Sequence, residues 1–164
     1  MARFADYVVG VDFSERLLEQ AKEKRNKVTG QIVGGANWRY YLEDAQSLHF
    51  EGSSFDIVGR FWNTFGNLYS SRDQVLRETK RVLKPEGRII MSVFAENILP
   101  TYLDLLSANG LRVSQQDENY IFLREGLVSE RFSRKKLEQI CESAGLNPQI
   151  EQLTDITYWC EATK

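Results

Sequence analysis

The stretch YVVGVDFS at positions 7–14 decides how this 164-residue chain folds. An apolar run leads to an acid, Asp12, and a serine then opens a segment with Leu17, Leu18 and Ala21 at helical spacing. A continuous apolar run is typical of a buried parallel strand, and nucleotide-binding α/β folds hold ribose hydroxyls with an acid at the carboxyl end of such a strand. The stretch therefore predicts a strand and a following helix in a fold of this kind.

In such folds the strand that ends in the acid is normally the second one, and a strand with a Gly-rich turn precedes it. Only residues 1–6 precede the apolar run here, so we expect a truncated domain whose amino-terminal βα unit is missing. Gly34 and Gly35 do not replace the missing turn, because they follow the second unit and open no helix after a strand.

Composition excludes several classes of protein. A net charge of −2 gives no attraction to nucleic acid or to an anionic membrane surface, and no apolar run approaches the roughly 20 residues of a membrane span. Cys141 and Cys160 have no CxxC spacing, which favours free thiols in a reducing cytoplasm. One histidine and two distant cysteines cannot form a zinc site. We expect a cytoplasmic protein with no metal, nucleic-acid partner or membrane contact.

Strand and helix signals alternate along the rest of the chain. The expected strands are 39–42, 55–59, 88–93, 149–153 and 157–162, with a hairpin of 111–114 and 120–124, and the expected helices are 14–25, 72–83, 97–109 and one that begins at 133. This order predicts a Rossmann-like three-layer α/β/α sandwich. Its mostly parallel sheet should hold both 7–12 and 55–59 and have an antiparallel last strand at its edge. We expect a single domain over 1–164, with 111–132 as an inserted hairpin or lid region.

Four segments carry a resemblance to a known family. VGVDFS at 9–14, EDAQSL at 43–48, SFDIV at 54–58 and RVLKPEG at 81–87 come in the order and spacing of class I S-adenosylmethionine-dependent methyltransferases, which the chain resembles over almost its whole length. FWNTFGNL at 61–68 resembles a loop of members that methylate small molecules. The resemblance implies methyl transfer from the sulfonium of S-adenosylmethionine to a small-molecule acceptor by in-line displacement. Orientation of the reactants supplies much of that catalysis, so no catalytic acid or base is expected.

The resemblance also implies which residues bind the adenosine part of S-adenosylmethionine. Asp12 would accept hydrogen bonds from both ribose hydroxyls, and Phe13 would lie beside the adenine. Asp44 would accept a hydrogen bond from the adenine amino group, and the Ala45 N–H would face the ring. The residues alone leave alternatives open: Asp12 could simply cap the helix, and Glu43 offers a carboxylate that competes with Asp44.

A second set of residues would lie where donor and acceptor meet. Arg60 and Phe61 leave the strand 55–59 beside the donor, and the residues expected at the acceptor are Trp62, Asn63, Tyr120 and Arg131. Asn63 would position the acceptor. Phe61, Trp62 and Phe65 are expected to be core or pocket-wall residues and not catalytic ones.

Two other features are read as structurally ordinary. The only histidine, His49, is expected to be a partly exposed side chain and not a catalytic base. The basic cluster at 134–136 is expected on a solvated helix face.

Three functions follow from these observations. The first is a small-molecule methyltransferase, which would bind S-adenosylmethionine weakly or not at all because the chain holds no Gly-x-Gly-x-Gly turn. The second is a catalytically inactive methyltransferase-like module for binding or oligomerisation. The third is an NAD(P)-dependent oxidoreductase, which also places an acid after its second strand but does not explain LKPEG at 83–87.

The strands 7–12 and 55–59 also bear on assembly. Both are apolar and carry no lysine or proline that would protect an exposed edge. We therefore expect a homodimer that covers these strands.

Overall fold

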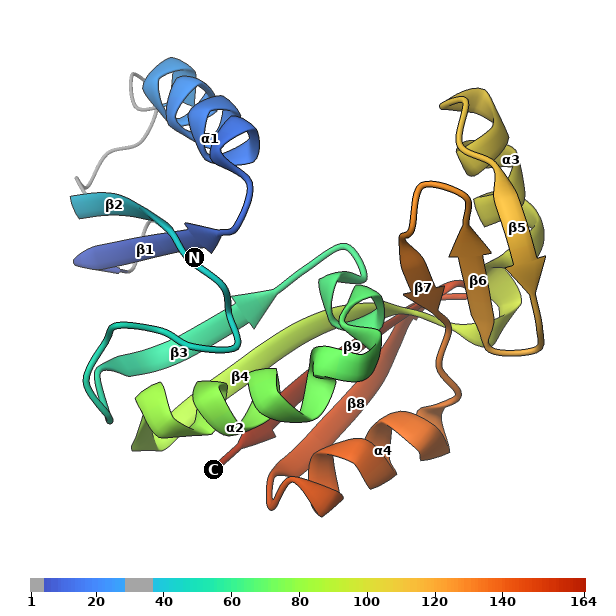
Figure 1. Cartoon of the computed structure of the whole chain (residues 1–164). Helices are drawn as coiled ribbons and strands as arrows, with labels where there is room; N and C mark the ends of the chain where they lie inside the picture. The colour runs from blue at the N-terminus through green and yellow to red at the C-terminus, as the bar shows by residue number, and fades with distance from the viewer. Residues whose placement is uncertain (1–4, 29–36) are drawn as a thin grey trace. The chain divides into compact units, whose positions relative to one another are not determined.

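The computed structural model describes residues 5–28 and 37–164. Contacts divide the chain into an amino-terminal unit, residues 1–49, and a carboxyl-terminal unit, residues 50–164. Each unit has its own sheet and is described by itself (Figure 1). Gly34 and Gly35 lie outside the described residues. In the part of the chain that is described, no helix is long and apolar enough to cross a membrane.

The amino-terminal unit is a βαβ unit. Strand β1 (Tyr7–Asp12) pairs in parallel with β2 (Asn37–Leu42), and helix α1 (Glu15–Val28) lies between them in the sequence. A Cβ added at Gly10 would come 2.8 Å from the Tyr40 ring, so glycine at this position allows the ring to pack over β1. This unit confirms the strand and helix expected from the opening stretch.

The carboxyl-terminal unit contains a four-stranded sheet in the order β3-β4-β9-β8. Its strands are β3 (Phe55–Arg60), β4 (Leu83–Phe94), β8 (Asn147–Thr154) and β9 (Thr157–Thr163). β3 and β4 are parallel, and β9 is antiparallel to both of its neighbours, so β9 alone is reversed. The expected reversal of the last strand is confirmed, but β9 lies inside the sheet and β8 forms the edge.

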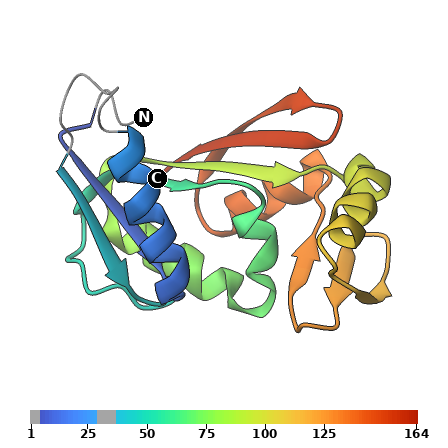
Figure 2. The same cartoon turned by 90° about the horizontal axis from the view of Figure 1, so that it is seen from above.

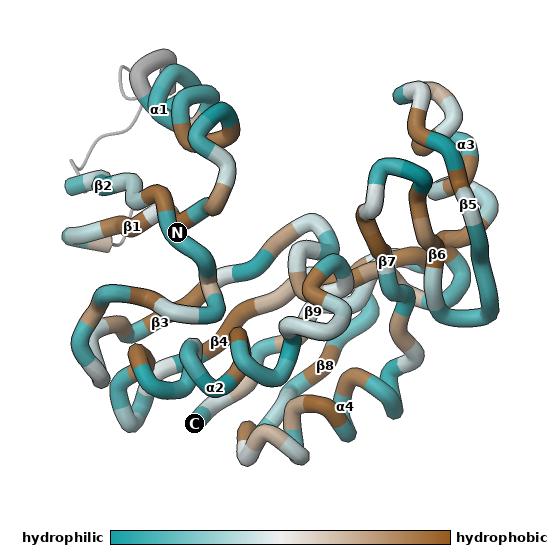
Figure 3. The backbone as a smooth tube through the Cα atoms, viewed as in Figure 1, coloured by the Kyte–Doolittle hydropathy of each residue, from teal (hydrophilic) through white to brown (hydrophobic). Residues whose placement is uncertain are grey.

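Helices α2 (Arg72–Val82) and α4 (Arg134–Ser143) cover one face of this sheet (Figures 1 and 2). Alternate residues of β4 and β9 face them, as the period of two in a strand requires, and Figure 3 shows the apolar stretches of these elements. The buried core includes, from the strands and from the helices, Ile89, Met91, Val93, Tyr158, Cys160, Ala162, Leu76, Leu137 and Cys141. The Cys141 and Cys160 sulfur atoms lie 4.0 Å apart.

One expectation about the sheet was wrong. Strands β1 and β3 do not share a sheet: β1 pairs with β2 and β3 pairs with β4. Among the described residues no second strand pairs with β1 or with β3, so each of these strands keeps one edge without a partner strand. The Rossmann-like α/β class still holds, because the βαβ unit, the reversed last strand and the helical layer are all present.

Strand β4 begins earlier than expected. Leu83 already has extended backbone angles and pairs with Phe55, although residues 84–87 were expected to form a turn before a strand at 88. The register shifts between Phe55 and Ile57, which absorbs the extra residues of β4. A Cβ at Gly87 would come 2.8 Å from the Leu83 side chain and 2.9 Å from the Lys84 carbonyl oxygen. Glycine is therefore needed at this position, where residues 83 and 84 of the same strand lie close to it.

A small sheet lies beyond the carboxyl end of β4 (Figures 1 and 2). The expected hairpin is confirmed as β5 (Val113–Gln116) and β6 (Tyr120–Leu123), and β7 (Val128–Glu130) adds a third strand that was not predicted. Helix α3 (Leu99–Ala108) packs on this sheet through a separate apolar core of Leu106, Ile121 and Leu123. Short 3-10 helices, η2 (Thr64–Asn67), η3 (Tyr69–Ser71) and η4 (Glu96–Ile98), complete the unit.

A buried carboxylate, Glu130, joins the small sheet to the helical layer. Glu130 is 0% exposed and forms ion pairs with Arg72 of α2 and with Lys136 of α4, whose Nζ lies 2.6 Å away. The hydroxyl of Tyr120 donates a third hydrogen bond over 3.1 Å. Because a buried charge is costly unless it is paired, these donors are needed to keep the carboxylate inside the protein. Of the basic cluster expected on a solvated face, Arg134 and Lys135 are exposed, whereas Lys136 is partly buried because its ammonium group reaches Glu130.

We predict that Glu130→Gln lowers the free energy of unfolding by about 3–5 kcal/mol, because it removes the buried anion that the partly buried Arg72 and Lys136 are paired with. Urea denaturation followed by circular dichroism measures this loss. The control is Glu161→Gln, which removes an exposed pair with Arg88 and should cost only about 0–1 kcal/mol. Equal losses in the two variants would contradict the structural role of Glu130.

Candidate functional site

The parallel pairing of β1 and β2 brings the predicted adenosine-binding residues to one edge. Asp12 pairs with Leu42, so the residues after both strands leave the sheet at the same end. The Glu43 N–H donates to the Asp12 carbonyl oxygen over 3.0 Å, which holds the two chain segments together. Asp12 and the segment that begins at Glu43 are therefore neighbours, although 30 residues separate them in the sequence.

The Asp12 carboxylate has one oxygen engaged and one available. Its Oδ1 accepts a hydrogen bond of 2.8 Å from the Ser14 N–H, which fixes the chain as it enters α1. Ser14 Oγ in turn accepts from the Leu17 N–H over 3.4 Å. Oδ2 accepts no hydrogen bond from the described residues, and the residue is only partly buried. Oδ1 is thus used at the beginning of the helix, and Oδ2 is available to bind a ligand.

The residues after β2 are engaged with their own neighbours. Asp44 is exposed, and its two oxygens accept from the backbone and side-chain N–H groups of Gln46, each over 2.9 Å. Glu43 is paired with His49, whose ring also lies against Tyr41 at 4.7 Å between centroids. Glu43, whose carboxylate was the alternative to Asp44 as the adenine ligand, is thus paired with His49. Ala45 is partly buried beside it.

These side chains suit the adenosine of the donor that the resemblance implies. A partly buried carboxylate with an available oxygen matches a pair of hydroxyls, and an exposed carboxylate after the next strand matches an amino group. Phe13, expected beside the adenine, is 81% exposed and offers an open ring face.

At the end of β3, Arg60 points away from solvent. It is 9% exposed, and its Nη2 donates to Thr79 of α2. Burial lowers the pKa of its guanidinium to about 10, and Nη1 has no partner among the described residues. The side chain lies between sheet and helix, so its predicted contact with the donor gains no support from this geometry.

Two aromatic residues follow Arg60 and remain accessible. Phe61 is 37% exposed and stacks on Trp159 with 5.9 Å between ring centroids. Trp62 is 86% exposed, and its backbone has a φ of 56°. Its N–H donates to Ser92 Oγ over 2.9 Å. Neither ring belongs to the buried core, and both remain accessible to solvent.

Asn63 is a tether between three elements. It is 1% exposed, and its Nδ2 donates over 3.1 Å to both Ser129 Oγ and the Glu130 carbonyl oxygen. Its Oδ1 accepts from the Phe94 N–H over 3.0 Å. All polar groups of the amide are therefore used within the chain, which favours a structural role over direct contact with an acceptor.

The remaining predicted residues surround the buried Glu130. Tyr120 donates to Glu130, and Lys136 Nζ lies 5.0 Å from the centre of its ring. Arg131 is 1% exposed, and its Nη2 donates to the carbonyl oxygens of Asp117 and Glu118 over 2.7 and 2.9 Å. Burial lowers the pKa of the Arg131 guanidinium. Arg131 thus holds the turn that precedes β6.

Sequence reasoning missed one residue of this region, Tyr69. Its ring meets the rings of Tyr120 and Phe122 edge-on, with centroids 5.5 and 5.8 Å away. It is 46% exposed, and its φ of 41° is in the left-handed region, which costs a residue other than glycine about 1–2 kcal/mol. The sequence signal was weak, because tyrosine after a short helix has no characteristic spacing.

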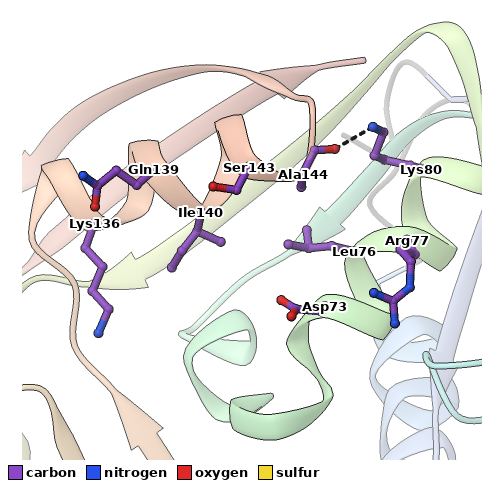
Figure 4. Close-up of a pocket in the computed structure, with 9 residues that line it drawn as sticks. All are labelled: Asp73, Leu76, Arg77, Lys80, Lys136, Gln139, Ile140, Ser143 and Ala144. Atoms are coloured by element: carbon purple, nitrogen blue, oxygen red, sulfur yellow. Dashed lines mark hydrogen bonds between the residues drawn. The ribbon is translucent and has the colours of Figure 1, made fainter.

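A groove of about 720 Å³ lies between α2 and α4, and none of the predicted site residues lines it (Figure 4). Polar side chains form its rim and apolar ones its floor. Its lining consists of Asp73, Leu76, Arg77, Lys80, Lys136, Gln139, Ile140, Ser143 and Ala144. Lys80 Nζ donates to the Ala144 carbonyl oxygen across one end, which joins the two helices.

Comparisons with known proteins show the family of this chain. The sequence pattern of the methyltransferase domain family (Methyltransf_11) matches residues 1–91. A demethylmenaquinone methyltransferase of Staphylococcus haemolyticus is 31% identical over 152 residues, which are 85% of this chain and 58% of that protein. The ubiquinone/menaquinone biosynthesis C-methyltransferase UbiE of Idiomarina loihiensis is 28% identical, over 84% of this chain and 55% of its own length. The chain thus spans little more than half of these relatives.

Solved structures support the fold. A SAM-dependent methyltransferase of Methanosarcina mazei superposes with a TM-score of 0.75 at 19% identity, over 99% of this chain and 84% of that one. The 1,6-didemethyltoxoflavin-N1-methyltransferase of Burkholderia thailandensis, solved with bound S-adenosylhomocysteine, gives a TM-score of 0.66 at 16% identity, over 96% and 60%. At these identities the likeness concerns the fold alone.

We predict that Asn63→Ala lowers the free energy of unfolding by about 1–3 kcal/mol for each buried group that it leaves unpaired, among them the Phe94 N–H. The measurement is urea denaturation. Asn109→Ala removes an exposed amide that bonds only to Leu105 and should change stability by less than about 0.5 kcal/mol. If both variants lose equally little, the Asn63 amide is not a tether and its role at the acceptor regains support.

Proposed function

Because this chain belongs to the methyltransferase domain family, we propose that it takes part in the transfer of a methyl group from S-adenosylmethionine to a small-molecule acceptor. The observation that carries the proposal is the edge where β1 and β2 end, since the family pattern over residues 1–91 includes it. The relatives are named for demethylmenaquinone and for ubiquinone/menaquinone biosynthesis, which supports an acceptor with a ring system.

In this proposal the amino-terminal unit holds the adenosine of the donor. The available oxygen of Asp12 accepts from the ribose hydroxyls, and Asp44 exchanges part of its bonding to Gln46 for the adenine amino group. The Ala45 N–H faces the ring and Phe13 covers it. When bound, the donor supplies a methyl group on a positively charged sulfur.

The carboxyl-terminal unit would orient the acceptor. Phe61 and Trp62 leave β3 with accessible rings, and the Asn63 tether fixes the backbone that carries them. Arg131 fixes the turn before Tyr120 in the same way. Such fixed positions suit a reaction in which alignment of the reactants provides most of the rate enhancement.

We predict that S-adenosylmethionine binds the chain more weakly than micromolar, because the residues proposed to hold it contact only the adenosine part. Asp12→Ala should weaken binding further by about 10- to 150-fold, or about 1.5–3 kcal/mol, since it removes a charge-assisted hydrogen bond. Isothermal titration calorimetry at millimolar donor measures both.

Asp56→Ala is the control, because Asp56 is an exposed acid paired with Lys84 and belongs to β3 of the carboxyl-terminal unit. It should bind the donor as the unaltered chain does. If Asp12→Ala also binds unchanged, the proposed adenosine site is wrong. If no donor binds at all, the inactive binding module becomes the better description.

We further propose that the chain forms a homodimer through its unpaired strand edges. In the described part of the chain, β1 and β3 each pair with one strand only, and Ile57 of β3 is 46% exposed. Unpaired N–H and C=O groups that become buried cost about 1–3 kcal/mol each, so a second copy that pairs with them stabilises both chains. β8, the other edge of the four-stranded sheet, carries Pro148 and Glu151, which discourage pairing.

We predict a dimer in analytical ultracentrifugation at micromolar concentration. Ile57→Lys should shift the equilibrium toward monomer, because a lysine on an edge strand opposes pairing. Leu153→Lys places the same charge on an exposed residue of β8 and should leave the dimer intact. A monomer at tens of micromolar for the unaltered chain would overturn this proposal.

A further inference from the structure

The groove between α2 and α4 has an apolar floor that belongs to the outer layer of the main core. Leu76 of α2 and Ile140 of α4 point toward one another across the groove (Figure 4). Leu76 is 3% exposed, and Ile140 and Ala144 are partly buried residues that pack against the core. The volume of about 720 Å³ lies within the range of about 300–1,000 Å³ that small-molecule sites occupy. The groove therefore offers a preformed apolar surface of the size of a small ligand.

Lys80 closes one end of this groove. Its Nζ donates to the carbonyl oxygens of Ala144 and Gly145 over 2.5 and 3.3 Å. These carbonyls lie at the carboxyl end of α4, where the partial negative charge of a helix stabilises a cation. The charge of Lys80 is thus used within the chain, and its contact limits the groove where both helices end.

Of the other two cations of the lining, Arg77 has no acidic partner among the described residues. Lys136 is paired with the buried Glu130. Arg77 is exposed and donates from Nε and Nη2 to the neutral Oε1 of Gln74, over 3.2 and 2.7 Å. Its Nη1 forms no hydrogen bond with the described part of the chain. Arg77 therefore brings to the rim a positive charge that no acid neutralises.

The one acid of the lining, Asp73, does not cancel this charge. It lies one helical turn before Arg77, in the first turn of α2, where an acid stabilises the positive end of the helix. Among the described residues it forms no ion pair with Arg77. The rim thus attracts an anion at the level of Arg77, directly beside the apolar floor.

We propose that this groove binds a small amphiphile, an aliphatic chain that ends in a carboxylate. The chain would lie on Leu76, Ile140 and Ala144, and removal of its apolar surface from water would supply most of the affinity. The carboxylate would accept hydrogen bonds from Arg77, whose planar guanidinium matches the two oxygens. Ser143 of the opposite wall would donate from its hydroxyl, which no hydrogen bond within the described residues engages.

The site goes beyond the proposed transfer of a methyl group. None of the residues proposed to hold S-adenosylmethionine or the acceptor lines the groove. The two walls come from α2 and α4, which pack on the four-stranded sheet, whereas Asp12 and Asp44 belong to the amino-terminal unit. Binding in the groove is therefore measured without any methyl donor.

The test titrates octanoate, octylammonium and acetate into the whole chain and follows binding by ligand-observed NMR at about pH 7, where the carboxylates are ionised. Octanoate should bind best, because octylammonium has the same sign of charge as Arg77 and acetate leaves the floor uncovered. Arg77→Gln should weaken octanoate binding by about 5-fold, the upper limit for an exposed charge pair. Arg124→Gln is the matched control, because Arg124 is an exposed arginine that does not line the groove. It should bind octanoate as the unaltered chain does.

A second pair of variants fills the groove. Ser143→Trp places a large ring in the groove from an exposed position of α4 and should abolish octanoate binding, while circular dichroism reports whether the fold is kept. Glu142→Trp places the same ring on the preceding exposed residue, which does not line the groove, and should leave binding unchanged. The proposal is overturned if the unaltered chain does not bind octanoate at millimolar concentration or binds octylammonium equally well. Unchanged octanoate binding in either Arg77→Gln or Ser143→Trp would also overturn it.

Discussion

The buried carboxylate of Glu130 is the constraint on which the carboxyl-terminal unit depends. Its charge is stable inside the protein only because Arg72, Lys136 and Tyr120 reach it from three different elements. Those donors fix the start of α2, the first turn of α4 and the beginning of β6 relative to β7. Because the Glu130 carbonyl oxygen also accepts from Asn63, the loop after β3 is positioned by the same residue. The positions of the accessible Phe61 and Trp62 therefore depend on the pairing of the buried Glu130 charge.

The two edge strands of the four-stranded sheet differ in composition. β8 is an outer strand with polar residues and a proline, whereas β3 is an outer strand that holds Phe55, Ile57 and Val58 and carries no lysine or proline. An exposed strand that is rich in apolar residues and lacks protective side chains tends to find a partner.

Asp12 shows that a structural and a functional interpretation of one residue can both hold. The sequence offered two alternatives, a cap for α1 or a ligand for ribose, and a carboxylate has two oxygens. Oδ1 serves the entry into the helix and Oδ2 does not. A fixed, partly buried carboxylate is better prepared to bind a ligand than a mobile one, because less conformational entropy is lost on binding. The cap is therefore compatible with the proposed contact to the donor.

The sequence by itself determined the local elements and the fold class. The apolar run before Asp12, the periodic helix at 72–82 and the capping by Ser133 are decided by residues close in the chain. Tertiary structure alone decided that β1 and β3 belong to separate sheets, that β9 lies inside its sheet, and that Lys136 is paired with a buried acid. It also decided the left-handed conformation of Tyr69. These outcomes depend on hydrogen bonds and charges between residues that are distant in the sequence, which periodicity and local propensity do not record.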